Sequence, residues 1–336
     1  MNSYGRLFRV HIFGESHGKS VGILLDGVPA GIPLAAEDFA ADLARRRPGA
    51  KGTTLRHEDD LGLLKSGVFQ DKTTGAPLLI GFDNKDTDSS AYDLLKDHPR
   101  PGHADFTAFH KFGGFNDYRG SGHFSGRITL GLVAAGVVAK KIIQNIRIEA
   151  GLVEAGGSER IEENVEHAVA TKNSIGAIIV CQATGVPVGL GEPFFDSVES
   201  LLSHIIFAVP GIRGIEFGAG FASAKMKGSE CNDPILDASG RTATNHAGGV
   251  NGGITNGNPL VFRVAVKPTS SIGQPQRTIN LHSGEQTSLV VEGRHDACFA
   301  LRLPVVIEAA TAIVLADLML LEQQVARIGN RAIETI

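Results

Sequence analysis

A serine and a histidine stand side by side between glycines near the start of the chain, in the segment GESHG at 14–18. The segment matches the G-x-S-x-G nucleophile elbow of serine hydrolases, in which a strand leads through a sharp turn into a helix. Residues 19–25 (KSVGILL) instead have the character of a second strand. We therefore expect a tight turn between two strands that projects Ser16 and His17 into a site. A serine hydrolase and an ordinary hairpin with an exposed histidine are the alternatives.

A second glycine-rich segment, GSGHFSG at 120–126, precedes an apolar stretch that is typical of a helix. It imitates a dinucleotide-binding fingerprint, but polar, glycine-rich residues at 112–119 replace the strand that should come first. Successive backbone N–H groups ahead of a helix N-terminus still attract an anion. The segment is therefore a candidate site for a phosphate or a reduced flavin ring, and a helix-start loop without a ligand is the alternative.

Arginines recur beside polar residues at several points of the chain. Three of them, RRR at 45–47, close a predicted helix before a Pro-Gly stop, and at least one of the three can face a pocket. The planar guanidinium suits carboxylate and phosphate oxygens. A small polyanionic ligand is therefore predicted, with further arginines beside the polar residues that could react with it: Arg100 near His103, Arg127 near Ser125, and Arg294 near Asp296.

Histidine and carboxylate pairs in the same segments could also bind a metal ion. His103 with Asp105, and His295 with Asp296, offer imidazole and carboxylate ligands. The many arginines nearby would repel a cation. We therefore expect no metal at this site.

The hydrophobic pattern predicts both helices and strands to hold these residues. The predicted helices are 34–47, 128–143, 161–170, 197–209 and 305–328, and the predicted strands include 7–13, 21–25, 77–82, 175–181, 259–266 and 288–291. Residues 51–71 and 83–127 have little periodicity but many Gly, Asp, His and Arg residues. Such a composition is typical of functional loops.

The chain also contains an internal repeat. GVPAGI at 27–32 returns 158 residues later as GVPVGL at 185–190, and GAPLL at 75–79 is echoed 182 residues later by GNPLV at 257–261. Each half ends in an alanine-rich helix, and the two helices would be buried best against each other with sheets outside them. We therefore predict an α+β fold, a single-domain β-α-β sandwich over residues 1–336 with a pseudo-twofold repeat of two halves, about 1–148 and 149–336.

Composition and charge exclude several classes of protein. The 336 residues include 20% charged and 42% hydrophobic ones, which is typical of a globular protein. The formal net charge is -4, and no Lys/Arg run is long enough to follow a nucleic-acid backbone, so no nucleic-acid partner is expected. Three cysteines favour a reducing, cytoplasmic compartment. The start of the chain lacks a signal-peptide core, and the apolar stretches 128–139 and 303–321 are interpreted as buried helices, so no membrane is expected.

Eight motifs, taken in order, resemble chorismate synthase from one end of the chain to the other. They are GESHG (14–18), RRRPG (45–49), SGVF (66–69), TTG (73–75), RPGHAD (100–105), NHAGG (245–249), KPTSS (267–271) and GRHD (293–296). The resemblance implies a shikimate-pathway lyase that converts 5-enolpyruvylshikimate 3-phosphate to chorismate by 1,4-anti elimination of phosphate. It also implies a homotetrameric flavoprotein that requires reduced FMN without net redox change, with FAD, NADP and NAD(P)H among the cofactors and reductants to be considered.

The resemblance implies roles for individual residues. His17 would protonate the departing phosphate, His103 would protonate or steady the reduced flavin near its N1 edge, and Asp296 would act with flavin N5 in removing the C6 proton. The implied substrate contacts are Ser16, which would also support this relay, Arg46, Arg100, Arg127 and Arg294. The implied flavin contacts are Arg46, His123, Phe124, Ser125, Pro210, Gly211, Gly252, Lys267, Pro268, Thr269, Ser270, Ser271 and Arg294.

Elementary electrostatics adds two expectations to the implied chemistry. The substrate carries two carboxylates and a phosphate, so a histidine that faces it should have a raised pKa and act as an acid at neutral pH. The carboxylate base needs a cation or donor nearby to stay ionised, and Arg294 and His295 are adjacent to Asp296 in sequence.

The chain departs from the family pattern in the loop 123–126, which is less basic than in many relatives, in a shorter segment between Gly151 and Ser174, and at two single positions. Ala297 replaces the proline that usually follows the His-Asp pair, and only Lys51 lies near the position of an arginine that often follows the Pro-Gly turn. One substrate contact of the family therefore has no direct counterpart. A non-catalytic anion-binding module is the further alternative, and phosphate release at background level would identify it.

Overall fold

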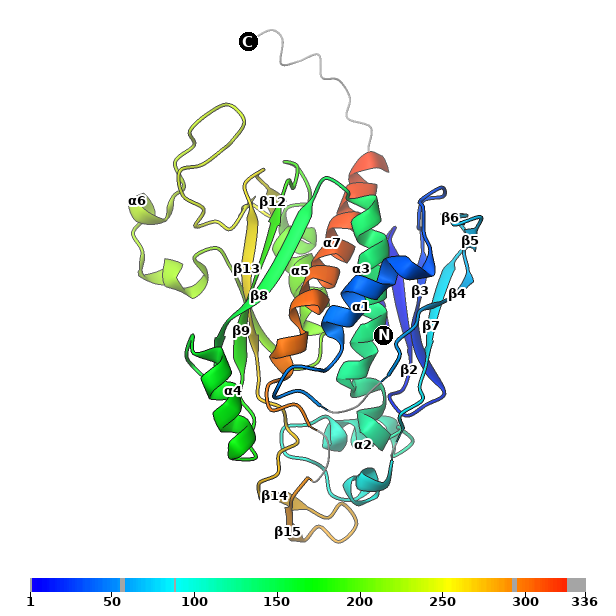
Figure 1. Cartoon of the computed structure of the whole chain (residues 1–336). Helices are drawn as coiled ribbons and strands as arrows, with labels where there is room; N and C mark the ends of the chain where they lie inside the picture. The colour runs from blue at the N-terminus through cyan, green and yellow to red at the C-terminus, as the bar shows by residue number, and fades with distance from the viewer. Residues whose placement is uncertain (1, 55–57, 88, 292–294, 325–336) are drawn as a thin grey trace.

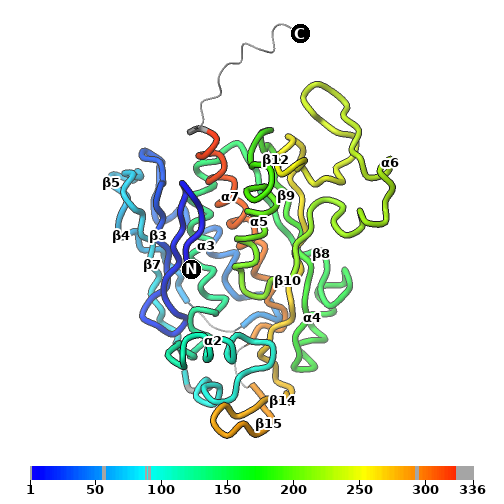
Figure 2. Tube along the Cα trace, turned by 180° about the vertical axis from the view of Figure 1, so that it is seen from behind, coloured from blue at the N-terminus to red at the C-terminus, as the bar shows by residue number. Residues whose placement is uncertain are grey.

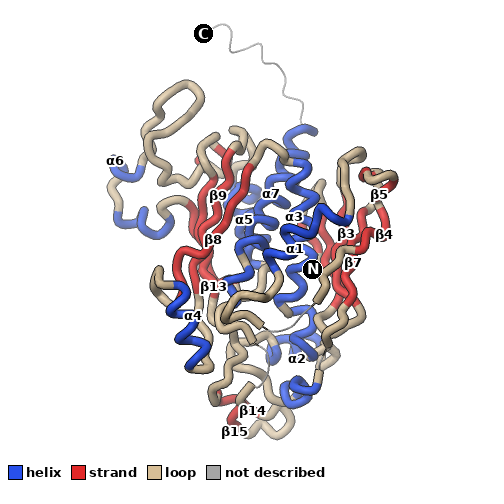
Figure 3. Tube along the Cα trace, in the orientation of Figure 1, coloured by secondary structure: helices blue, strands red, loops and turns tan. Residues whose placement is uncertain are grey.

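The computed structural model describes residues 2–54, 58–87, 89–291 and 295–324. Two antiparallel sheets flank a group of helices (Figures 1 and 3). Loops and short elements around α2 (Asp105–Phe112) close one end of this arrangement, at the bottom of Figure 1. The mixed α+β class predicted from the sequence is confirmed.

The first sheet is built by the N-terminal part of the chain in the order β1-β2-β3-β7-β4. Its strands are β1 Ser3–Tyr4, β2 Arg9–Gly14, β3 Ser20–Asp26, β7 Leu78–Asp83 and β4 Leu63–Ser66. The central strands β3 and β7 are apolar along most of their length, and the paired residues Ile23 and Ile80 are fully buried. Helices can therefore cover one face of this sheet without leaving polar groups unpaired.

The second sheet has the order β10-β13-β9-β8 and lies on the other side of the helices. Its strands are β8 Arg147–Ala155, β9 Ala177–Thr184, β10 Ile212–Phe217 and β13 Leu260–Val266. Cys181 and Phe262 are paired across the central strands and are fully buried. Three two-stranded ribbons complete the strands: β5 Val68–Phe69 with β6 Lys72–Thr73, β11 Val250–Asn251 with β12 Ile254–Thr255, and β14 Gln276–Ile279 with β15 Gln286–Leu289.

Four helices lie between the sheets: α1 Ala40–Arg46, α3 Thr129–Ile142, α5 Val198–Phe207 and α7 Pro304–Gln324. The helices α3 and α7 are apolar on most sides, as buried helices must be. They approach so closely that a Cβ on Gly136 would stand 2.6 Å from the Cα of Ala309. Glycine is therefore required at this crossing.

The helix α7 is long and apolar enough to cross a membrane, with a mean hydropathy of 2.0 over Pro304–Glu322, but 78% of its apolar window is buried inside the protein. It packs against α3, α5 and β8. The buried carboxylate of Asp317 accepts the backbone N–H groups of Arg6, Leu7 and Phe8 at 2.9, 2.7 and 2.8 Å. In this fold α7 is a core helix that also anchors the N-terminal segment.

The remaining elements are short and lie mainly outside the helical group. The helix α4 Ile161–Ala170 packs against β8, and Figure 2 shows the segment around α6 Gly228–Cys231 reaching away from the second sheet. The 3-10 turns are η1 Ala36–Phe39, η2 Ser90–Lys96, η3 Arg119–Phe124, η4 Gly126–Ile128, η5 Phe194–Asp196, η6 Gly220–Lys225 and η7 Phe299–Arg302.

Most predicted elements are found within a few residues of their expected positions. The helix at 161–170 is reproduced as α4, and the helix predicted at 305–328 corresponds to α7 as far as the structure describes it. The strand predicted at 288–291 is displaced to β15. The prediction missed β10, whose residues are mostly half-buried, and α2, which buries only Ala108 and so lacks a repeating apolar face.

Candidate active site

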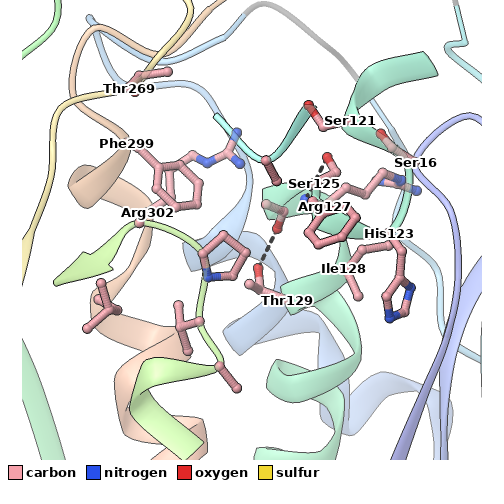
Figure 4. Close-up of a pocket in the computed structure, with 18 of the residues that line it drawn as sticks. Ser16, Ser121, His123, Ser125, Arg127, Ile128, Thr129, Thr269, Phe299 and Arg302 are labelled. Carbon is pink, nitrogen blue, oxygen red and sulfur yellow. Dashed lines mark hydrogen bonds between the residues drawn. The ribbon is translucent and has the colours of Figure 1, made fainter. Parts of the chain in front are cut away.

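A cavity of about 780 Å³ opens at the end of the molecule where the loops gather. Its walls come from β1 and β2, the segment 120–129, the end of α5, the start of β10, the segment 267–271 and η7. Figure 4 shows Ser16, His123 and Arg127 on one side and Phe299 and Arg302 on the other. Segments more than 100 residues apart in sequence thus meet around one space.

The segment 14–18 forms the turn between β2 and β3, as the sequence predicted. No helix follows the turn, so the nucleophile-elbow interpretation of Ser16 is wrong. Ser16 is buried, lines the cavity, and donates its backbone N–H to the carbonyl of Gly122 at 3.0 Å. His17 lies directly behind this wall, with its Nδ1 hydrogen-bonded to Ser89 Oγ at 2.8 Å and its ring edge-on to Tyr92.

The segment 120–126 wraps over this turn and leads into α3. Gly120 and Ser121 both have positive φ, and a Cβ on Gly120 would collide with the His17 ring. Ser125 Oγ accepts the N–H of Arg127 and so caps the turn that begins the helix. His123 hydrogen-bonds through Nδ1 to the carbonyl of Gly14 at 2.8 Å, which ties the segment to β2. The predicted flavin contacts in this segment, including Phe124, all line the cavity.

Arg46 and Arg127 are buried in the cavity wall among a few acidic residues. Arg127 donates to Asp60 at 2.9 Å and to Asn84 Oδ1 at 2.5 Å, but its Nη2 is buried without a hydrogen-bond partner. Arg46 donates to Thr129 Oγ1 at 3.1 Å and lies 3.8 Å from the Asp60 carboxylate. Arg127 Nη2 also lies 3.8 Å from Oε1 of Glu58, so the two guanidinium groups are held in place by Asp60 and Glu58.

Burial affects the charge of Arg46 strongly. Loss of water, together with the nearby charges of Arg302 and Arg127, lowers the pKa of Arg46 to about 9, although Asp60 and Asp296 oppose the shift. The group still carries its charge at neutral pH. An anion that enters the cavity therefore gains from a cation that the protein alone leaves poorly neutralised.

Arg100, predicted to contact substrate, is engaged mainly within the protein. It binds the carboxylate of Asp105 through two hydrogen bonds of 2.8 Å and donates to the hydroxyls of Ser271 and Ser121. It lines the cavity but is only 5% exposed. Through these contacts Arg100 connects the RPGHAD segment to Ser121 and to Ser271, which lie on different segments of the cavity wall.

His103 shares the same carboxylate, with Nδ1 at 2.6 Å from Asp105 Oδ1. This contact assigns the ring proton to Nδ1 and leaves Nε2 as an acceptor. Burial lowers the pKa of His103, and Arg100 and Lys267 lower it further, while Asp105 raises it. The protein without ligands therefore holds His103 neutral, whereas the sequence analysis expected a raised pKa in the presence of an anionic substrate.

Asp296 lies in the cavity wall. Its Oδ1 accepts the backbone N–H of Thr54 at 2.8 Å and lies 3.7 Å from Nη1 of Arg302. The sequence analysis named Arg294 and His295 as the groups that keep this carboxylate ionised; Arg294 is outside the described residues. Arg302, six residues further along at the end of η7, supplies a cation that adjacency in sequence did not reveal.

The segment 267–271 and the end of α5 form the remaining wall. Lys267 donates to Ser270 Oγ at 2.9 Å and to the carbonyl of Gly102. The predicted contacts that line this wall are Pro210, Gly211, Lys267, Pro268, Thr269, Ser270 and Ser271. Gly252, in the β11–β12 ribbon, does not line this cavity, because that ribbon lies at the far end of the second sheet.

Cationic residues outnumber acidic residues in the lining of the cavity. Among the described lining residues there are six arginines and lysines, Arg46, Arg100, Arg127, Arg213, Lys267 and Arg302, and three acids, Glu58, Asp60 and Asp296. No group of three or more potential metal ligands occurs within the part of the chain that the structure describes. The sequence analysis did not single out Glu58, Asp60, Arg213 or Arg302, although the loop 51–71 had been marked as functional. The fold and the site together define an α+β protein with a preformed cavity for small polyanions.

Comparison with known proteins identifies the family. A profile described as chorismate synthase matches residues 8–320. The chorismate synthase of Chitinophaga pinensis is 64% identical over 329 residues, covering 98% of this chain and 99% of the relative, and that of Dehalococcoides mccartyi strain BAV1 is 45% identical over 351 residues, covering 95% and 96%. A crystal structure of chorismate synthase superposes with a TM-score of 0.72 at 26% identity, covering 95% of this chain and 93% of the other. The chain belongs to the chorismate synthase family.

Family membership confirms the activity that the motifs implied. The protein is an enzyme, a carbon–oxygen lyase that eliminates phosphate from 5-enolpyruvylshikimate 3-phosphate to give chorismate, the last common step towards the aromatic amino acids. The family uses a reduced flavin.

Proposed function

We propose that the cavity holds the substrate and reduced FMN together, and that its own acid and base groups carry out the elimination. The observation that carries this proposal is the excess of cations in the cavity lining, with Arg127 Nη2 and Arg302 Nε buried without hydrogen-bond partners. A buried donor without a partner costs about 1–3 kcal/mol, and a bound anion removes that cost. A ligand with two carboxylates and a phosphate fits such a lining.

The residues present also fit a flavin. A cavity of about 780 Å³ is within the size range of ligand pockets, and apolar surface from Phe124, Ile128 and Phe299 lies beside the polar groups. The residues that would hold the flavin are His123, Phe124, Ser125, Pro210, Gly211 and the segment 267–271. When bound, reduced FMN supplies electron density to the substrate as the phosphate leaves, without being consumed.

His17 is the proposed acid for the departing phosphate. Its Nδ1 is hydrogen-bonded to Ser89 Oγ at 2.8 Å, and the Nε2 edge of the ring faces Gly120, a residue of the cavity wall. Glycine at position 120 leaves room for the ring in this position, because a Cβ there would stand 2.5 Å from Nε2. Ser16, on the same turn, would position the phosphate oxygen.

His103 is proposed to steady the flavin. Asp105 holds the ring at a fixed angle, and Arg100 holds Asp105. An anion placed next to His103 raises its pKa again, so that the imidazole takes up a proton when the cavity is filled. Filling the cavity thereby restores the raised pKa that the sequence analysis expected.

Asp296 is the proposed base for the C6 proton. The Thr54 N–H donates to Oδ1 of Asp296 at 2.8 Å and the Arg302 guanidinium lies 3.7 Å from the same oxygen, so both groups would orient the carboxylate that accepts the proton. Arg46 and Arg127 would bind the anionic groups of the substrate, and Arg100 would help mainly by orienting His103. Arg294, predicted to contact both ligands, lies outside the described residues.

We also propose that the chain is one domain made of two related halves, about 1–148 and 149–336. The strand order supports this proposal. Both sheets are antiparallel, and the four strands β2-β3-β7-β4 of the first correspond in order to β8-β9-β13-β10 of the second. Applying the offsets of 158 and 182 residues to the pair Ile23–Ile80 gives Cys181–Phe262, which is also an observed pair.

A buried threonine in each half adds independent support for the repeat. Thr73 Oγ1 accepts the N–H of Ile32 at 2.9 Å and donates to the carbonyl of Pro29 at 2.6 Å. Thr255, 182 residues later, makes the same two contacts with Leu190 and Pro187 at 2.9 and 2.6 Å. The two GVP turns, at 27–32 and 185–190, are therefore held by equivalent pairs of hydrogen bonds.

We propose further that the enzyme is a cytoplasmic homotetramer, with NAD(P)H as a candidate reductant for its flavin. Large apolar side chains at the surface, such as Phe195 at 92% and Phe221 at 83% exposure, support association of subunits. Sedimentation or light scattering at several concentrations tests the tetramer, and anaerobic NAD(P)H addition tests the reductase activity.

Titration of flavin under anaerobic conditions tests the proposed site. We expect tight binding of reduced FMN only when substrate is present, because the glycine-rich loops of the cavity must become ordered around a bound anion, and the second ligand then binds to loops that are already ordered. Equal affinity for oxidised and reduced FMN, with or without substrate, would contradict the proposal.

A further inference from the structure

Asn84 lies behind the cavity wall, at the end of the strand β7. It follows Asp83, the last residue of that strand, which pairs with Ser20 at the start of β3. The backbone N–H of Asn84 donates to the carbonyl of Lys19 at 3.1 Å, so the pairing of the two strands extends to this residue. Asn84 is half-buried and is not one of the described residues that line the cavity. Its side chain therefore acts on the wall and not on a ligand.

The side-chain amide of Asn84 holds the turn that carries Ser16 and His17. Its Nδ2 donates to the carbonyl of Glu15 at 3.0 Å and to the carbonyl of Gly18 at 2.8 Å. These two carbonyls stand on either side of Ser16 and His17 in the chain. The N–H of Gly18 also donates to the carbonyl of Glu15 at 3.0 Å, which closes the turn. One amide group thus fixes both ends of the two-residue segment that bears the proposed acid.

The oxygen of the same amide holds Arg127. Oδ1 of Asn84 accepts the Nε–H of Arg127 at 2.5 Å, while Nη1 of the arginine donates to Asp60 at 2.9 Å. The partners set the orientation of the amide, because its nitrogen faces two carbonyls and its oxygen faces a guanidinium. A carboxylate at this position would keep the acceptor but would lose both donors. The amide therefore joins a buried arginine of the cavity wall to the turn of the proposed acid.

The chain that follows Asn84 is itself held in place. The buried carboxylate of Glu58 accepts the backbone N–H groups of Lys85 and Asp86 at 3.0 and 3.3 Å. Strand pairing thus holds Asn84 from one side, and Glu58 holds the chain on the other side. A side chain supported in this way can keep the groups that it contacts in one geometry.

We propose that Asn84 is a positioning residue that sets the place of the turn bearing His17 relative to Arg127. This inference rests on the proposed function of the cavity, in which His17 is the acid and Arg127 binds an anionic group of the substrate. An acid must lie within hydrogen-bond reach of the group that it protonates, and a misplacement of about 1 Å can cost about 10²-fold in rate. A side chain that hydrogen-bonds to both parts controls that geometry without touching the substrate.

The test is a double-mutant cycle on the full-length enzyme loaded with reduced FMN. Phosphate release is followed in a single turnover with enzyme in excess, so that slow variants remain measurable. Asn84→Ala should lower the rate by roughly 10- to 100-fold, because the turn and the guanidinium lose their common hydrogen-bond partner. In the His17→Ala background the same change should lower the rate by about threefold or less, since residues that act as a unit are not additive. Asn84→Asp keeps the acceptor for Arg127 but not the donors to the turn, so its rate should fall as in Asn84→Ala.

Asn164→Ala is the matched control. Asn164 also donates its Nδ2 to a backbone carbonyl, that of Ala155 at 2.8 Å, but it lies on α4 and outside the cavity lining. This variant loses a hydrogen bond of the same kind and should keep the wild-type rate. If Asn84→Ala does not fold, Asn84→Asp, which has nearly the same size, takes its place in the cycle.

The failing outcomes separate this inference from the proposed function. A wild-type rate in Asn84→Ala, or the same fractional loss with and without His17, would overturn the positioning role while the cavity and its acid stand. A wild-type rate in Asn84→Asp would also overturn it, because the donors to the turn would then be dispensable. If His17→Ala releases phosphate at the wild-type rate, the proposed acid is wrong and this inference falls with it.

Discussion

A single methyl group at Gly120 should disable the enzyme without unfolding it. Gly120 has φ +56°, and an added Cβ would stand 2.5 Å from Nε2 of His17 and 2.9 Å from Oγ of Ser16, with the ring carbon Cδ2 closer still. Ordinary van der Waals contact needs about 3.5–4.0 Å. The His17 ring must therefore move by roughly 1 Å, and a displacement of that size can cost about 10²-fold in rate.

Gly157→Ala is the matched control for the backbone strain in Gly120→Ala. Gly157 has φ +82° but no atom within 4 Å of an added Cβ. Both variants should lose about 1–2 kcal/mol of folding free energy because alanine disfavours the left-handed conformation. Only Gly120→Ala should lose about 10²-fold in kcat/KM, measured as phosphate release with reduced FMN. Equal turnover in the two variants would refute the placement of His17 as the acid.

Three further results are expected. Asp296→Asn should keep substrate and flavin bound, because its side-chain oxygen still accepts the Thr54 N–H, while phosphate release slows by about 10²- to 10⁴-fold; near-normal release would remove Asp296 from the mechanism. Asp317→Ala should lower the free energy of unfolding in urea by about 3 kcal/mol or more, since three backbone donors lose their acceptor. The control Asp196→Ala breaks only an exposed ion pair and should cost less than about 1 kcal/mol. Equal losses in the two variants would contradict this prediction. The pKa of His103 is lowered in the folded protein, so the contribution of His103 to stability is complete above the unfolded pKa of about 6.5 and is lost as the pH falls through the folded pKa. His103→Gln should remove this part of the pH dependence of stability. An unchanged pH profile of unfolding in His103→Gln would count against this prediction.

Local chemistry made much of the site predictable from the sequence. The β2–β3 turn follows from two strand-like runs around GESHG, and the repeated GVP turns and alanine-rich helices follow from patterns that each half carries within itself. The motifs then placed nearly all predicted contacts, including Ser16, His103 and Asp296, on one cavity. Short-range patterns suffice when the residues that act together lie in the same turn or segment.

The partners that side chains find in the folded protein, and the depth of their burial, were beyond such patterns. Arg302, six residues further along the chain, lies 3.7 Å from Asp296, because η7 folds back on the loop that carries this carboxylate. Arg100 was predicted to face the substrate, yet its two strongest hydrogen bonds go to Asp105, only five residues away. The lowered pKa of His103 depends on burial, which a sequence does not display. The β-bulge at Arg213 in β10 depends on strand register, which is likewise a property of the folded sheet.

The most direct measurement is a single turnover of the wild-type enzyme under anaerobic conditions. Enzyme in excess, loaded with reduced FMN, is mixed rapidly with 5-enolpyruvylshikimate 3-phosphate, and phosphate, chorismate and the oxidation state of the flavin are followed together. If one cavity holds both ligands and its own residues remove the proton and protonate the phosphate, each substrate should give one phosphate and one chorismate, and the flavin should end reduced. Phosphate release at the same rate without flavin, or flavin oxidised in step with product, would contradict the assignment of this cavity.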